Sequence, residues 1–351
     1  MRFAASEDEA SARIAKCLCF QVFVFVMSRS RKGLSVLGSS MKGTAMRNFK
    51  GLLLGIGVAA LLSGSALAAD VLVRKAPPPP APAPTPLWDL AFGAALMSDY
   101  NFRGVSQSNR EISYGAYAEL QFNPANMGQF YVGLAAWRVN WPSTPAFGFT
   151  NPAAEVDITG GWRNKWGAFA LDLGFIYYYY PNEVFNGFTS NSDFWEFAVK
   201  AAYDVTPDLT FGVNVFYTPD LLNYSQSFAA VGVAAKASAT YASITGKWVT
   251  PWKSGDFGSY ISGELGHWWI ASSGFVATGY VDPSYSYANI GLAITWKTLT
   301  LDFRYHGNDM NVATCTAFLW SAPGNPSNAW CGSAFIVALK FDTTLSALTA
   351  K

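Results

Sequence analysis

Two opposite charges stand four residues apart in the stretch SDYNFRGVSQSN, where Asp99 and Arg103 follow the apolar run LWDLAFGAALM. Four is an even spacing, so in an extended chain both side chains point to the same side. Opposite charges on one wall can pair with each other or across a cavity and shape a mouth, or they can select a charged solute. Gly104 allows the chain to turn sharply directly afterwards. The choice between these roles stays open and depends on what surrounds the segment.

Catalytic and metal-binding chemistry has little support in the pattern. The histidines of the chain are His267 and His306, and the second lies near Asp302 in the sequence. A serine could approach His306, but neither a G-x-S-x-G or H-E-x-x-H motif nor a Cys/His cluster accompanies it. The sequence therefore predicts a protein that is not an enzyme, with no metal and no cofactor. A hydrolase is kept as a less favoured alternative.

Composition suggests what surrounds the opening segment. The 351 residues are 51% hydrophobic, 16% aromatic and 13% charged, whereas soluble domains carry about 25% charged residues. From Asp70 onward, however, the sequence lacks the ~18 consecutive apolar residues of a membrane helix. A closed β-barrel in lipid satisfies every backbone group without such runs, so an all-β transmembrane barrel is the leading prediction.

The chain's longest apolar run lies in MRNFKGLLLGIGVAALLSGSALAAD, which begins at Met46. A basic start, a short apolar core and an A-x-A site are the pattern of a cleaved secretory signal. This predicts a signal peptide over 46–68, with cleavage between Ala68 and Ala69. A retained anchor helix is the alternative.

The segments on either side of this signal are predicted to lie outside the folded domain. Residues 1–45 are expected to be an N-terminal extension from a wrongly chosen start, the true start being Met41 or Met46. Residues 69–86, ADVLVRKAPPPPAPAPTP, are rich in proline and predict an extended periplasmic spacer.

Charge and cysteine usage change when the first 68 residues are set aside. They hold 9 of the 24 basic and 3 of the 23 acidic residues, which leaves 15 basic and 20 acidic. This acidic balance argues against a nucleic-acid partner. Cys17 and Cys19 leave with the leader, while Cys315 and Cys331 remain. An even pair in an exported protein predicts a disulfide.

Short alternating segments recur from residue 87 onward and predict an antiparallel up-and-down barrel of about twelve strands over 87–342, followed by a tail over 343–351. Most are close to the nine to eleven residues of a tilted transmembrane strand. They are 88–100, 113–122, 130–141, 154–162, 169–179, 194–203, 209–217, 237–248, 259–269, 285–296, 299–305 and 333–341. Tight turns such as NPANMG and RNKWG alternate with long connections, which is typical of an outer-membrane barrel.

Aromatic residues favour a membrane barrel over a soluble, lipocalin-like one. The alternation alone does not say which face is outside. Two girdles of aromatic residues mark the two interfaces of a membrane barrel. The expected turn-side girdle holds Trp88, Phe122, Trp162, Tyr203, Trp248 and Trp296, and the expected loop-side girdle holds Tyr100, Trp141, residues 177–180, Tyr217, Trp268, Trp269 and Tyr305.

If the apolar faces meet lipid, the charged residues of the strands face the lumen. The predicted pore-lining residues are Asp99, Arg103, Glu119, Arg138, Glu155, Asp157, Arg163, Asp172, Glu196, Lys200, Glu264, Asp302 and Arg304, with Lys297 and Lys340 beside them. Charges of both signs can line water or neutralise one another across a closed interior.

The opening stretch resembles the S-D-Y-x-F-R-G-x-S-x-S signature of the TorF family of porins. FYVGLAAW, DLGFIYYYYP, FWEFAV and FRYHGND follow in an order that is also similar to that family. The resemblance implies an outer-membrane channel and names no solute. The segment SAFIVALKF resembles the closing strand that the barrel-assembly machinery recognises, although the tail DTTLSALTAK departs from that pattern.

Together these features predict a porin-like channel in the outer membrane of a Gram-negative cell. Small hydrophilic solutes or ions would diffuse passively through a narrow charged lumen, and the partners would be outer-membrane lipid, the solute and the barrel-assembly machinery. Twelve strands lie between the filled eight-stranded barrels and the water-filled sixteen-stranded ones. A structural or adhesive barrel with a closed lumen is therefore the main alternative.

Overall fold

The computed structural model describes residues 85–141, 149–185, 192–229, 236–271, 284–310, 315 and 330–349. The chain divides into the units Met1–Leu54 and Gly55–Lys351, and all described residues belong to the second. The predicted N-terminal extension, the signal peptide with its cleavage site, and all but the last two residues of the Pro-rich spacer lie outside the described residues.

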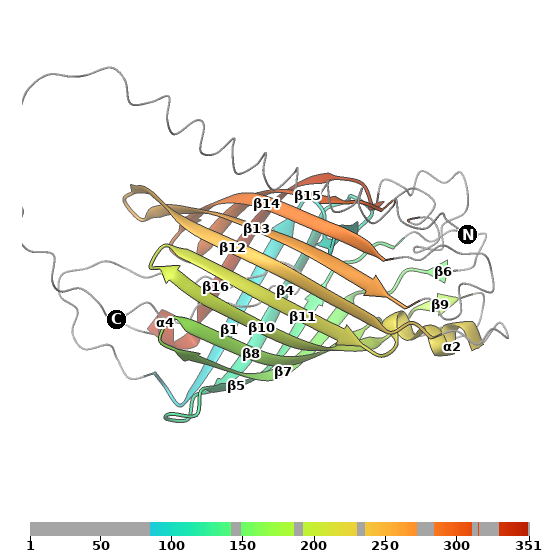
Figure 1. The fold of residues 1–351 in the computed structure, drawn as a ribbon, viewed down its shortest axis with the longest axis horizontal. Helices are drawn as coiled ribbons and strands as arrows, with labels where there is room; N and C mark the ends of the chain where they lie inside the picture. Colours follow the sequence, from blue (N-terminus) through green and yellow to red (C-terminus); the bar gives the residue numbers. More distant parts are fainter. Residues whose placement is uncertain are drawn as a thin grey trace, which may run out of the picture. The chain divides into compact units, whose positions relative to one another are not determined.

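Within the described residues, twelve antiparallel strands form a closed barrel, because the first strand pairs with the last (Figure 1). This confirms the predicted up-and-down barrel. The strands are β1 (Trp88–Met97), β4 (Ser113–Phe122), β5 (Gln129–Trp137), β7 (Glu155–Trp166), β8 (Phe169–Tyr179), β10 (Phe194–Thr206), β11 (Leu209–Thr218), β12 (Ala239–Ser254), β13 (Phe257–Ile270), β14 (Tyr285–Trp296), β15 (Leu299–Asn308) and β16 (Ala334–Thr344).

Several boundaries differ from the predicted ones. β1 ends at Met97 and β5 at Trp137, earlier than expected, because the chain then leaves the barrel wall. β12 and β13 run past the predicted ends, with a register irregularity between Val249 and Lys253. At the C-terminus β16 extends to Thr344, so the predicted tail contributes two residues to the last strand.

Short elements lie outside the barrel wall. The strands β2 (Asn101–Phe102) and β3 (Val105–Ser106) form a hairpin, and β6 (Phe149–Thr150) pairs with β9 (Val184–Phe185). The helices η2 (Leu221–Asn223) and α2 (Tyr224–Ala229) follow β11, and α4 (Leu345–Thr349) follows β16. No helix in the described part of the chain has the length and apolar character needed to cross a membrane.

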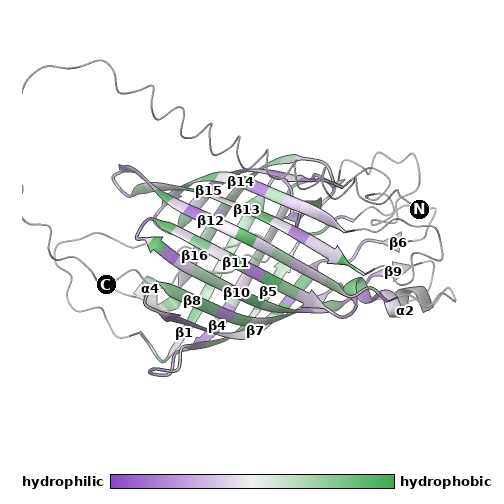
Figure 2. Cartoon of the chain, viewed as in Figure 1, coloured by the Kyte–Doolittle hydropathy of each residue, from purple (hydrophilic) through white to green (hydrophobic). Residues whose placement is uncertain are grey.

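Hydrophobic and hydrophilic residues are interspersed along the strands of the barrel (Figure 2), and many large hydrophobic residues of the strands are exposed. On β11, exposed Phe211 and Val213 alternate with the fully buried Asn214 and Thr218. The period-2 alternation therefore places apolar side chains outside and polar ones inside. Exposed aromatic residues lie at both strand ends: Trp88, Trp166, Tyr203, Trp248 and Trp296 near the tight turns, and Tyr114, Tyr179, Tyr217, Trp269 and Tyr305 near the long connections.

Some aromatic residues expected in the outer loop-side girdle point inward instead. Tyr100, Tyr178, Tyr180 and Trp268 are buried and belong to clusters inside the barrel. The girdle prediction is wrong for these four. Tyr178 and Trp268 alternate on their strands with outward Tyr179 and Trp269, and Tyr100 and Tyr180 lie past the ends of β1 and β8.

Large inward side chains cover inward glycines on neighbouring strands. Trp137 lies over Gly115, and Tyr241 lies over Gly266, so that a Cβ at either glycine would overlap the ring. Glycine at these positions lets a bulky ring lie flat against the inner wall, which fills the interior of the barrel.

We expect Gly115→Ala to lower the free energy of unfolding by about 1–3 kcal/mol, since the added methyl group must displace Trp137 or the carbonyl of Ala136. Urea unfolding in detergent micelles, followed by tryptophan fluorescence, measures this. Gly160→Ala is the matched control, because the nearest atom to its new Cβ is 3.6 Å away. Equal stability of the two variants would contradict the packing argument.

Candidate functional site

The segment after β1 folds back into the barrel. Its hairpin, residues 101–106, is called the lumen hairpin below. Arg103 and Gly104 form the two-residue turn and have positive φ values of 48° and 89°, as the favoured hairpin turn requires. The side chain of Asn101 holds this turn by accepting a hydrogen bond from the Gly104 N–H at 2.9 Å. Asp99 and Arg103, the two opposite charges of the stretch SDYNFRGVSQSN, therefore lie inside the barrel.

Arg103 joins the lumen hairpin to the opposite wall. Both terminal nitrogens of its guanidinium donate to the carboxylate of Glu196 on β10, each at 2.8 Å. Tyr178 donates to the same carboxylate at 3.1 Å. Four rings surround the guanidinium, with Cζ 4.4–4.8 Å from each centroid: Phe102, Phe216, Tyr241 and Trp268. A bidentate ion pair away from water, enclosed by aromatic faces, is a strong attachment.

Asp99 anchors the base of the same segment. Its carboxylate accepts hydrogen bonds from Ser106 and Ser108 and pairs with Arg110 at 2.9 Å. Arg110 also donates to the backbone carbonyls of Trp330, at 3.2 Å, and Gly332. The segment after β1 is therefore tied to the residues just before β16. Sequence reasoning missed Arg110, because it lies outside every alternating segment.

The predicted disulfide between Cys315 and Cys331 is confirmed. Both cysteines are buried and belong to the cluster that also contains Phe102 and Val105 of the lumen hairpin. The bond therefore lies where the last long connection meets the hairpin.

Two carboxylates of β7 face the interior. Glu155 accepts hydrogen bonds from the hydroxyls of Tyr100 and Tyr180, and Asp157 accepts one from the indole of Trp137 at 3.2 Å. Their inward direction agrees with the alternation of β7. Their partners are neutral donors, so these carboxylates hold aromatic residues of the loop side in place.

A second set of charges lies deeper in the barrel. Arg163 pairs with Glu119 at 2.5 Å. Asp172 on β8 is the register partner of both Arg163 on β7 and Lys200 on β10. The hydroxyl of Tyr131 donates to Asp172 at 2.8 Å. Lys200 and Asp172 are both buried, so this wall carries a desolvated group of mixed charge.

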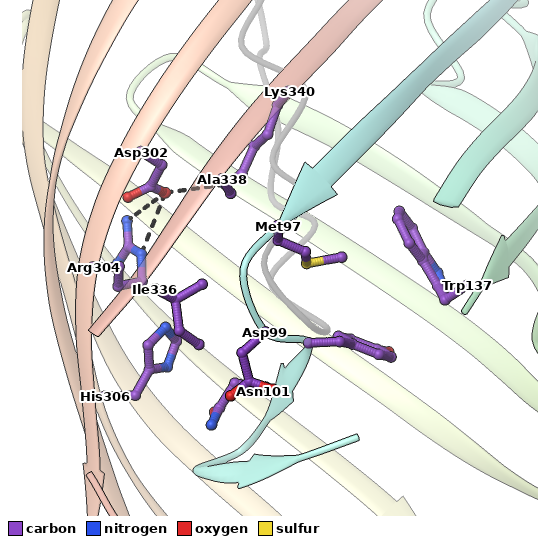
Figure 3. Close-up of a pocket in the computed structure, with 11 residues that line it drawn as sticks. Met97, Asp99, Asn101, Trp137, Asp302, Arg304, His306, Ile336, Ala338 and Lys340 are labelled. Atoms are coloured by element: carbon purple, nitrogen blue, oxygen red, sulfur yellow. Dashed lines mark hydrogen bonds and ion pairs between the residues drawn. The ribbon is translucent and has the colours of Figure 1, made fainter. Parts of the chain in front are cut away.

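A third charged set lies on β15 and β16. Asp302 pairs with Lys340 at 3.0 Å and with Arg304 at 3.2 Å. Arg304 also donates to Asn289 and to the hydroxyl of Ser262, and Glu264 accepts from Asn289 at 3.2 Å. Beside this set a cavity of about 40 Å³ opens towards the lumen hairpin (Figure 3).

Two of the predicted lumen residues do not face the lumen. Arg138 follows the last residue of β5, whose inward positions are the odd-numbered ones, and it pairs with exposed Glu111 at 2.7 Å. This hydrogen bond lowers the pKa of Glu111. Lys297 lies in the tight turn after β14 and pairs with Asp256 at 3.7 Å, with both side chains more than half exposed. Both assignments are wrong. Position 138 has the outward parity of β5, whereas Lys297 has the inward parity of β14 but lies in a turn, where strand parity no longer applies.

The histidines lie in hydrogen-bonded positions on the strands. His306 contacts the hydroxyl of Tyr287 through Nδ1 at 2.8 Å, and His267 contacts that of Ser286 at 3.0 Å. Across the described ranges, no group of three or more His, Cys, Asp or Glu side chains is placed to hold a metal ion.

Comparison with known proteins gives a family match over part of the chain. Residues 81–245, somewhat less than half, match the family Gcw_chp, described as a bacterial protein of unknown function. No curated protein matches the sequence.

Among the similar solved structures are, by their descriptions, two porins and one outer membrane channel. The NanC porin is 12% identical with a TM-score of 0.43, covering 72% of this chain and 98% of its own. An outer membrane channel from Pseudomonas putida F1 is 12% identical with a TM-score of 0.41, covering 74% and 97%. The KdgM porin is 11% identical with a TM-score of 0.36, covering 72% and 98%.

Proposed function

We propose that this protein is an outer-membrane channel through which small hydrophilic solutes or ions diffuse passively. One observation carries the proposal: the closed barrel has an apolar, exposed outer face and directs most of its charged strand residues inward. An exposed apolar belt is unfavourable in water and favourable in lipid. The exposed aromatic residues near both strand ends are where a membrane barrel places its interfacial girdles.

The interior suggests a narrow path with a constriction. Deep in the barrel, Arg163 keeps some exposure, 15% of its side chain, beside Glu119. Towards the long connections, the lumen hairpin and the rings around Arg103 fill the interior. A solute would therefore cross the turn-side half along charged walls and pass the loop-side half where the hairpin yields. Inward charges of both signs favour weak ion selectivity.

The closed-lumen structural or adhesive barrel is the second candidate, and the ion pair between Arg103 and Glu196 favours it. A buried bidentate pair inside a cluster of aromatic residues is suited to a permanent plug. The two candidates differ in one property, the passage of ions through the folded protein.

Conductance across planar lipid bilayers decides between them. We expect discrete steps after insertion of the purified, folded barrel in 1:1 electrolytes, with a reversal potential close to zero across a salt gradient. Gel mobility before and after heating verifies that the inserted protein is folded. If the inserted protein is folded but gives no conductance steps, the proposed channel function is wrong and the closed-lumen barrel is the remaining candidate.

Export and assembly belong to the same proposal. We propose that the chain is cleaved between Ala68 and Ala69, inserted by the barrel-assembly machinery, and functions in the outer membrane of a Gram-negative cell, as TorF family porins would. The support is the signal pattern and the motif over 98–108. N-terminal sequencing of protein from isolated outer membranes tests the cleavage, and an intact leader would contradict it.

A further inference from the structure

Besides the ion pair with Glu196, a second set of contacts holds the lumen hairpin, and it comes from the residues just before β16. Trp330, Cys331 and Gly332, with the disulfide to Cys315, are called the clasp below. We propose that the clasp keeps the lumen hairpin inside the barrel and so holds the channel in a constricted state. The inference rests on the proposed channel function and names the contact that restrains its constriction.

Hydrogen bonds join the clasp to the chain that leaves the hairpin. The indole N–H of Trp330 donates to Oδ1 of Asn109. The guanidinium of Arg110 donates to the carbonyl oxygens of Trp330, at 3.2 Å, and Gly332. The backbone N–H of Arg110 donates in turn to Oγ of Ser106, the last residue of the hairpin, at 3.0 Å. A short run of contacts therefore leads from the clasp to the hairpin itself.

The backbone of residues 109 and 110 indicates that this segment is held in place. Asn109 and Arg110 have φ values of 54° and 58°, in the left-handed region. Asparagine adopts this region more readily than most other residues, but arginine rarely does. A residue stays in such a conformation where its surroundings fix it. The bonds of Arg110 to the hairpin on one side and to the clasp on the other do so here.

The clasp is enclosed together with the hairpin. Trp330, Cys331 and Cys315 are each at most 3% exposed. Both cysteines belong to the same buried cluster as Phe102 and Val105 of the hairpin. If the hairpin moved out of its position, apolar side chains of this cluster would meet water, which is unfavourable. Packing therefore restrains the hairpin in the same sense as the hydrogen bonds.

The disulfide limits where the clasp can move. β15 ends at Asn308 and β16 begins at Ala334, so a long connection joins them. Cys315 and Cys331 lie 16 positions apart within it, and their bond ties the clasp to the part of the connection that follows β15. A cross-link removes many of the conformations open to a long connection. Without it, the clasp would keep its contacts with the hairpin segment less often.

The test is amide hydrogen exchange of the full folded barrel in detergent micelles, followed by mass spectrometry. In Cys315→Ala/Cys331→Ala we expect the amides of residues 99–110 to exchange about tenfold faster or more, because local opening of the hairpin becomes easier. Trp330→Phe keeps an aromatic ring and removes the donor to Asn109, so exchange there should rise several-fold. Trp269→Phe is the matched control, because it changes an exposed tryptophan of β13 and should leave exchange unchanged.

The strand β11 is the internal reference for the stability of the barrel, and its exchange should be the same in all variants. If the cysteine variant exchanges in residues 99–110 no faster than Trp269→Phe, the clasp does not hold the hairpin. If β11 and residues 99–110 accelerate equally, the disulfide stabilises the whole barrel and the clasp is likewise overturned.

Single-channel conductance of the same variants separates the clasp from the channel function. We expect the cysteine variant to conduct about twofold better or more, since the filling of a twelve-stranded barrel limits its free cross-section. Faster exchange of the hairpin with unchanged conductance would show that the clasp does not restrain the constriction. If no variant conducts, the proposed channel function is wrong, whereas hydrogen exchange still decides whether the clasp holds the hairpin.

Discussion

Replacing Arg103 with alanine is expected to raise the single-channel conductance by about twofold or more, because the free cross-section of a twelve-stranded barrel is limited by what fills it. The substitution removes both 2.8 Å bonds to Glu196 and the four ring contacts that hold the lumen hairpin against the wall. Without them the hairpin leaves its position more often. Recordings in planar bilayers at fixed salt and voltage measure the change.

Arg138→Ala is the matched control for this experiment, since it removes the same charge from the exposed rim. Its conductance should equal that of the unmodified protein. The double variant Arg103→Ala/Glu196→Ala should conduct like Arg103→Ala, because one interaction is lost in both. If Arg103→Ala conducts no better than Arg138→Ala, the hairpin is not the constriction.

Asp172→Ala is expected to lower the free energy of unfolding by about 3–5 kcal/mol, because it leaves buried Lys200 without the carboxylate opposite it. It also removes the acceptor of the Tyr131 hydroxyl. In a conducting barrel the same change leaves surplus positive charge in the lumen, so the reversal potential should move towards anion selectivity. Urea unfolding in micelles and a salt-gradient measurement give the two results.

Asp256→Ala removes a carboxylate from the exposed pair with Lys297 and serves as the control. Exposed pairs contribute little because water screens both charges, so no resolvable change in stability is expected. If the two variants unfold at the same urea concentration, the buried charges of β8 and β10 do not support the barrel as argued.

The β-barrel fold could be predicted from the sequence. Successive side chains on a strand point to opposite faces of the sheet. Because one face meets lipid and the other meets the lumen, apolar and polar residues alternate along the strand, as exposed Phe211 and Val213 do with buried Asn214. Tight turns such as the one over Lys297 separate the strands. The pairing of Cys315 with Cys331 was also predictable, because two cysteines allow a single bond.

Only the tertiary structure decided what lies inside the barrel. The partner of Arg103 is Glu196, 93 positions away, and no local period connects residues so distant. Alternation predicts the direction of a side chain only within a strand, so it failed for Lys297, which has the inward parity of β14 but lies in the exposed turn after it. It also could not show that Arg110 reaches the carbonyls before β16. The sequence by itself determined the wall, because each strand meets lipid and lumen locally. The side chains that fill the lumen depend on the closing of the barrel, because a closed barrel brings segments from all parts of the chain into one enclosed space.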